Sequence, residues 1–172
     1  MHKFLLFRKV FFAIIVITAT SETSFSQCYF DVEFNLIHSR RIPYQNVTIN
    51  MTQNCMTDSA IVKLVSNPSD LNSIKWEYSK IDTTFKISRS EFEKIIKSVK
   101  QIKLIDIKYN PNIVSFGADG TTCIIGYGNN SDHVRFSKWS PDYNTESRGL
   151  QEFLNSCILI LKMVNLDPKE IL

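Results

Sequence analysis

The sequence is short of glycine and histidine, on which several common kinds of active site depend. Its 172 residues include five glycines and three histidines. Neither Gly-x-x-x-x-Gly-Lys nor Gly-x-Gly-x-x-Gly occurs, so the usual phosphate-binding loops are missing. There is also no internal repeat, low-complexity tract or apolar run long enough to span a membrane. These absences argue against a nucleotide-dependent enzyme and predict no membrane span once an N-terminal signal is removed.

The sequence also lacks local patterns for metal binding and nucleophilic catalysis. His38 and His133 are far apart and have no metal-ligand spacing, so we expect both to be solvated. No Gly-x-Ser-x-Gly elbow occurs, and Cys123 and Cys157 fall within apolar runs, where a thiol is normally inert. The sequence therefore predicts no catalytic residue, no metal and no cofactor.

The first 26 residues have the pattern of an export signal. Positive residues precede a ten-residue apolar run over 10–19, and Ser24-Phe25-Ser26 provides a small-x-small cleavage site. We expect residues 1–26 to be removed and 27–172 to form one domain, secreted or periplasmic. A lipid anchor on Cys28 is the rival interpretation, but Gln27 stands where a lipobox has a small residue.

The predicted mature domain is nearly neutral. Three of the 20 basic residues and one of the 17 acidic residues lie in 1–26, which leaves a net charge of +1. Such a domain has no long-range field to attract nucleic acid, so we expect no nucleic-acid partner.

Four cysteines, all in the predicted mature domain, favour disulfides in an exported protein. We expect Cys28 to pair with Cys55, and Cys123 with Cys157. The alternative is that Cys123 and Cys157 are free and pack as small apolar residues.

Several stretches alternate between apolar and polar residues, as strands with one buried face do. The clearest is Tyr29 to Ile37, and Ile102 to Tyr109 alternates more weakly. The same period predicts further strands over 47–52, 60–65, 74–81, 121–127 and 133–137, with 83–87 continuing the sheet.

Two segments have helical periodicity. Ser88 and Glu91 form a capping box, and an apolar stripe follows through Val99. A second helix over 150–165 is apolar almost all round, as expected for a buried helix or one partly at an interface. Strands in runs with few helices predict an α+β fold, mostly antiparallel sheet with two helices packed on one face.

One polar segment contains two aromatic residues that we expect to be exposed. Residues 138–147 connect the last strand to the final helix and contain Trp139 and Tyr143, residue types that anchor binding partners. The alternative is that Trp139 folds back to cap the core. Lysines also recur every third residue at Lys94, Lys97, Lys100 and Lys103. We interpret them as a solvated helix face, with an acidic partner as the alternative.

These observations favour a small exported binding protein. One concrete form is a periplasmic inhibitor or immunity-type protein that contacts a protein partner through 138–147, with Trp139 and Tyr143 as anchors. A first alternative is a hydrolase of cell-wall or extracellular polymer, with two carboxylates that meet only in the folded chain. A second is a structural, envelope-associated protein whose final helix mediates dimerisation. The sequence predicts no particular oligomeric state.

Overall fold

The structure, a computed structural model, describes residues 29–38, 44–68, 80–107, 120–129 and 131–172. The predicted signal peptide 1–26, Cys28 and all but the last two residues of the predicted strand 74–81 lie outside these ranges. Within them, no helix combines the length and apolar character needed to cross a membrane.

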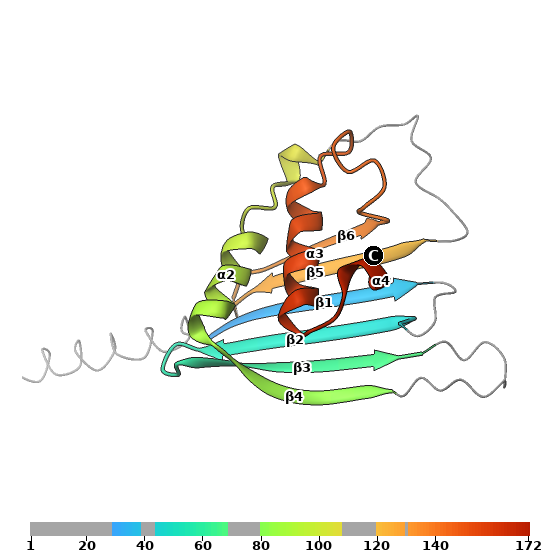
Figure 1. Cartoon of the computed structure of the whole chain (residues 1–172). Coiled ribbons are helices and arrows are strands. Elements are labelled where there is room, and N and C mark those ends of the chain that lie inside the picture. Colours follow the sequence, from blue (N-terminus) through green and yellow to red (C-terminus); the bar gives the residue numbers. More distant parts are fainter. Residues whose placement is uncertain (1–28, 39–43, 69–79, 108–119, 130) are drawn as a thin grey trace, which may run out of the picture.

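Six strands form one antiparallel sheet (Figure 1). Their order across the sheet is β4-β3-β2-β1-β5-β6, so the first strand lies near the middle. The strands are β1 (Tyr29–His38), β2 (Asn46–Asn54), β3 (Ser59–Asn67), β4 (Ile81–Ser88), β5 (Thr121–Gly128) and β6 (His133–Trp139). The α+β prediction, with helices on one face of an antiparallel sheet, is confirmed.

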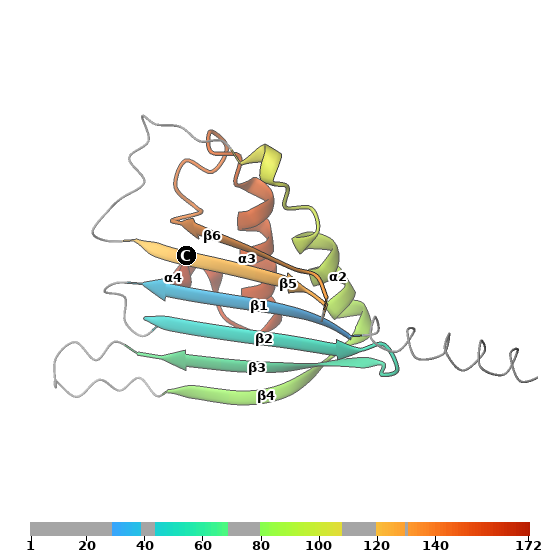
Figure 2. The same ribbon diagram turned by 180° about the vertical axis from the view of Figure 1, so that it is seen from behind.

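Alternation along the strands separates the two faces of the sheet. Val32, Phe34 and Leu36 of β1 are buried under the helices, while Asp31, Glu33 and Asn35 point to the other face. We call this second face, which carries no helix of the described chain, the open face (Figure 2). The predicted strand Tyr29 to Ile37 is thus confirmed, with its polar side on the open face.

The main helices are α2 (Arg89–Val99) and α3 (Gln151–Met163), with the short α4 (Pro168–Ile171) after them. α2 begins at the predicted capping box, in which Ser88 and Glu91 each bond the backbone N–H of the other. It buries Phe92, Ile95 and Val99 against the sheet. α3 packs beside α2, and the hydroxyls of Ser98 and Ser156 hydrogen-bond between the two helices at 2.8 Å.

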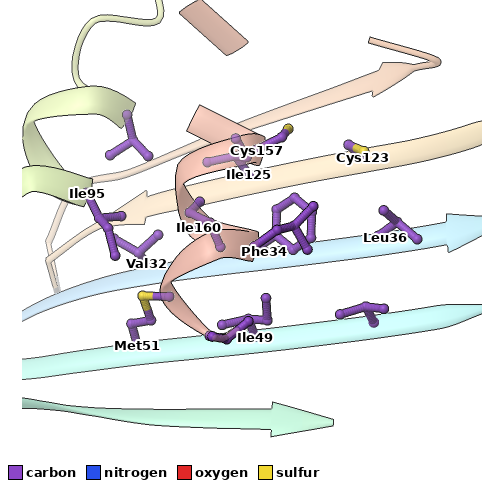
Figure 3. Close-up of a cluster of buried hydrophobic side chains, with 14 of the residues drawn as sticks. Val32, Phe34, Leu36, Ile49, Met51, Ile95, Cys123, Ile125, Cys157 and Ile160 are labelled. Atoms are coloured by element: carbon purple, nitrogen blue, oxygen red, sulfur yellow. The ribbon is translucent and has the colours of Figure 1, made fainter. Parts of the chain in front are cut away.

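A single apolar core fills the space between helices and sheet (Figure 3). Phe34 of β1, Ile49 of β2 and Ile160 of α3 are all fully buried in it. The expectation that the final helix is deeply buried is therefore confirmed for one side of α3. Burying one face of the sheet in this way leaves the open face to carry polar residues such as Asp31, Glu33 and Asn35.

One predicted strand is wrong. The chain over 102–107 contains the short 3₁₀ helix η1 (Leu104–Asp106), and no strand. Ile102 is buried, but Leu104 and Ile105 are 73% and 88% exposed, so the weak alternation matches no buried face. Without that burial the backbone closes its hydrogen bonds locally, from Asp106 to Lys103 and from Ile107 to Leu104.

Candidate functional site

The segment after β6 is held by one buried arginine. Arg148 is 8% exposed, and its guanidinium donates to the carbonyls of Ser140 at 2.7 Å, Tyr143 at 2.8 Å and Trp139 at 2.7 Å. Burial lowers the pKa of Arg148, and nearby Asp142 partly offsets that effect. Because one side chain bonds three carbonyls, it fixes the turn from Trp139 to Arg148 in a single shape.

That turn brings the two predicted anchor residues together. The rings of Trp139 and Tyr143 meet edge to face, with centroids 6.5 Å apart and planes at 65°. Tyr143 is 54% exposed, while Trp139 is half-buried and is the last residue of β6. The indole lies against Gly120, where a Cβ would come within 2.2 Å of its Nε1. Phe136 of the same strand is buried on the helix side of the sheet. Trp139 is three residues further on, so strand alternation puts its side chain on the open face, where the ring covers the end of β5.

An exposed aliphatic residue extends this aromatic end of the sheet. Ile37 pairs with Thr122 and Thr122 pairs with Trp139, so all three lie in one row across the open face. Ile37 is 51% exposed. We call Ile37, Trp139 and Tyr143 the apolar end of the open face.

A second group of side chains lies further along the same face, and we call Asp31, Glu33, Asn35 and His133 the polar cluster. Nε2 of His133 lies 3.2 Å from Oδ2 of Asp31, and the two side chains are 40% and 30% exposed. Asn35 donates to Oε1 of Glu33 at 2.5 Å. The expectation that His133 is merely solvated is therefore incomplete, because its ring contacts a carboxylate from another strand.

Two glycines of β5 make this contact possible. Gly128 pairs with Asp31 on one side and with His133 on the other, and Gly126 is the next residue on the same face. A Cβ on Gly126 would lie 2.8 Å from Cε1 of His133 and 3.4 Å from Oε2 of Glu33. Glycine inside a strand weakens it and often marks a close approach. Here it lets the imidazole lie across β5 and reach β1.

The sequence contained part of this signal. The polar face of β1 was evident, and the alternation of β5 places both glycines on one face. What the sequence could not show is the strand order, which puts β6 two strands from β1 although 102 residues separate His133 from Asp31.

The two carboxylates of the polar cluster lack the arrangement that the hydrolase alternative requires. Residues two apart on a strand are separated by about 6.6 Å along it, within the range for glycosidase carboxylates. Asp31 and Glu33, however, lie side by side on one strand, whereas the hydrolase alternative requires two carboxylates facing each other across a cleft. No set of three or more potential ligands in the described ranges is placed to hold a metal ion.

The cysteines partly contradict the predicted pairing. Cys123 of β5 and Cys157 of α3 are fully buried free thiols, so the predicted disulfide between them is wrong (Figure 3). Burial, with a contribution from the neighbouring Cys123 thiol, raises the pKa of Cys157 well above its ordinary value. The two residues pack as small apolar side chains. Cys55 is not a free thiol, but Cys28 lies outside the described residues, and their pairing stays a prediction.

A pocket of about 210 Å³ lies away from both groups, between η1 and the start of α3. Its lining includes Ile102, Ile107 and Phe153, and its polar residues include Lys103 and two carboxylates, Asp106 and Glu152. It shares no lining residue with the apolar end or the polar cluster.

The chain matches no protein-family model, and no curated protein shows significant sequence similarity to it.

Proposed function

We propose that this chain is an exported binding protein that holds a protein partner on its open face, as a periplasmic inhibitor or immunity-type protein would. The observation that carries the proposal is the Trp139–Tyr143 pair, in which Tyr143 is exposed and Trp139 half-buried, fixed by the three bonds from Arg148. Tryptophan and tyrosine are the residue types that most often dominate binding energy at protein interfaces.

The rigidity of the pair favours binding. Association costs free energy for each side chain and loop that must be ordered, and a segment already held in one shape avoids much of that cost. Arg148 donates its hydrogen bonds to backbone carbonyls, so it orders the turn without covering the rings of Trp139 and Tyr143. The exposed Ile37 adds apolar area beside them.

The open face also suits a partner better than a polymer substrate. Asp31 and Glu33 share one strand of the sheet, so the described part of this face offers contact area and no cleft between these two carboxylates. For these reasons we prefer binding to the hydrolase alternative.

Hydrogen exchange on a purified complex tests this proposal. The exported, tagged protein is used to capture a partner from its own cells, and the complex is rebuilt from the two purified chains. We expect slower exchange over 131–148 and along β1 when the partner is bound. Protection confined to the exposed surface of α2 and α3 would contradict binding on the open face.

A further inference from the structure

Two carboxylate oxygens of the polar cluster accept no hydrogen bond within the described part of the chain. A carboxylate accepts hydrogen bonds and does not donate, so Nε2 of His133 carries the proton in its contact with Asp31. Asn35 donates one of its two amide N–H groups to Oε1 of Glu33. Among the described residues, no further hydrogen bond reaches Oδ1 of Asp31 or Oε2 of Glu33.

Such a cluster fits a ligand with many donors and a positive charge. The guanidinium group of arginine has five N–H donors, no acceptor and a permanent charge, and it binds carboxylates in pairs of parallel bonds. An ammonium ion provides three donors from one point, which matches acceptors spread over two side chains less well.

The basic residues on the open face do not occupy this position. Arg135 of β6 and Lys63 of β3 share the row of Glu33, each two strands away or about 9.6 Å. Lys86 of β4 lies three strands from Asp31, in its row. Within the described ranges none of the three forms an ion pair with Asp31 or Glu33.

We propose that the polar cluster binds an arginine side chain of the protein partner. This inference rests on the proposed function and adds the chemistry of the partner. From Glu33 to Ile37 is four residues along β1, or about 13 Å. An extended segment of the partner that places arginine on Asp31 and Glu33 would therefore place a residue about four positions away on the apolar end. The partner would combine an arginine with an apolar or aromatic residue at that spacing.

The test is an NMR titration of the full chain with the peptide acetyl-Gly-Arg-Gly-amide at millimolar concentration. The control peptide carries citrulline, which has the shape of arginine without its charge. We expect the arginine peptide to shift the amide signals of Glu33, Gly126 and His133. The citrulline peptide should bind more weakly by a factor of about five or more. Equal binding of the two peptides, or shifts confined to other residues, would overturn the proposal. So would equal shifts with a neutral oligosaccharide.

Variants separate this inference from the proposed function. Asp31→Asn with Glu33→Gln should abolish the response to arginine, while Asp82→Asn, which removes an exposed carboxylate of β4, should leave it unchanged. If these variants respond alike, the polar cluster is not the arginine site. A partner that binds wild type and the cluster variant equally would overturn the inference and leave the proposed function standing. If the cluster binds the arginine peptide but the chain captures no protein partner, the arginine site would stand and the proposed function would be overturned.

Discussion

Arg148 is the residue on which the shape of the proposed binding surface depends. Its three carbonyl partners span the turn from Trp139 to Tyr143, and each loses the bond from the guanidinium if that group is removed, although the Ser140 carbonyl still accepts from the N–H of Tyr143. A buried polar group left unsatisfied costs about 1–3 kcal/mol.

We therefore predict that Arg148→Met lowers the free energy of unfolding by about 2–4 kcal/mol. Urea unfolding followed by tryptophan fluorescence measures the change. Arg135→Met, on the exposed edge strand, is the matched control and should change stability by less than about 0.5 kcal/mol. Similar values for the two variants would show that the carbonyl bonds do not hold the turn.

The two buried cysteines give a second prediction at this scale. Because burial raises the pKa of Cys157, its thiol stays protonated and shielded in the native protein. A thiol reagent at pH 8 should modify Cys123 and Cys157 only after unfolding in urea. A raised folded-state pKa stabilises the native protein below the unfolded pKa, so stability should fall as the pH rises above about 8.5. Rapid modification of either thiol in the native protein would contradict the structure.

Among the elements, α2 was the one that the sequence predicted best. Its start depends on two residues three apart, Ser88 and Glu91, and its buried stripe on a local period, so no long-range information was needed. The strands were predicted because their alternation of apolar and polar residues is also a local pattern. The segment 102–107 failed because its apolar residues Leu104 and Ile105 are not buried, and only the folded chain decides burial. The polar cluster likewise depends on strand order, which local patterns do not encode.

The capping box gives a prediction for α2. Hydrogen bonds from Ser88 lower the pKa of Glu91, so this carboxylate stabilises the fold above its unfolded pKa and loses that effect as the pH falls through its folded pKa. Ser88→Ala should cost about 1 kcal/mol at pH 7 and less at a pH low enough to protonate Glu91. Thermal unfolding at both pH values measures this difference. Ser90→Ala, an exposed serine two residues later in the first turn of α2, serves as the control. A cost that does not change with pH would argue against the carboxylate's part in the cap.

For the whole molecule, stability comes from one face of the sheet and binding is proposed for the other. The core lies entirely between the sheet and the helices, so substitutions there should act on stability alone.

Two isoleucines test this division. Ile160 of α3 is fully buried and Ile105 is 88% exposed. Ile160→Ala should lower the free energy of unfolding by about 2–5 kcal/mol, and Ile105→Ala by less than about 0.5 kcal/mol. Chemical denaturation of both variants checks the contrast. Equal effects would mean that α3 does not pack on the sheet as described.

The most direct measurement of the central claim is the dissociation constant of the purified partner for two double variants. Trp139→Ala with Tyr143→Ala removes the aromatic pair. Leu104→Ala with Ile105→Ala removes two exposed apolar residues of η1, which lies outside the sheet. Binding on the open face predicts that the first variant weakens affinity by more than about 2 kcal/mol, or roughly 30-fold, and that the second binds like wild type. Unchanged affinity of the first variant, with its fold intact, would contradict the account.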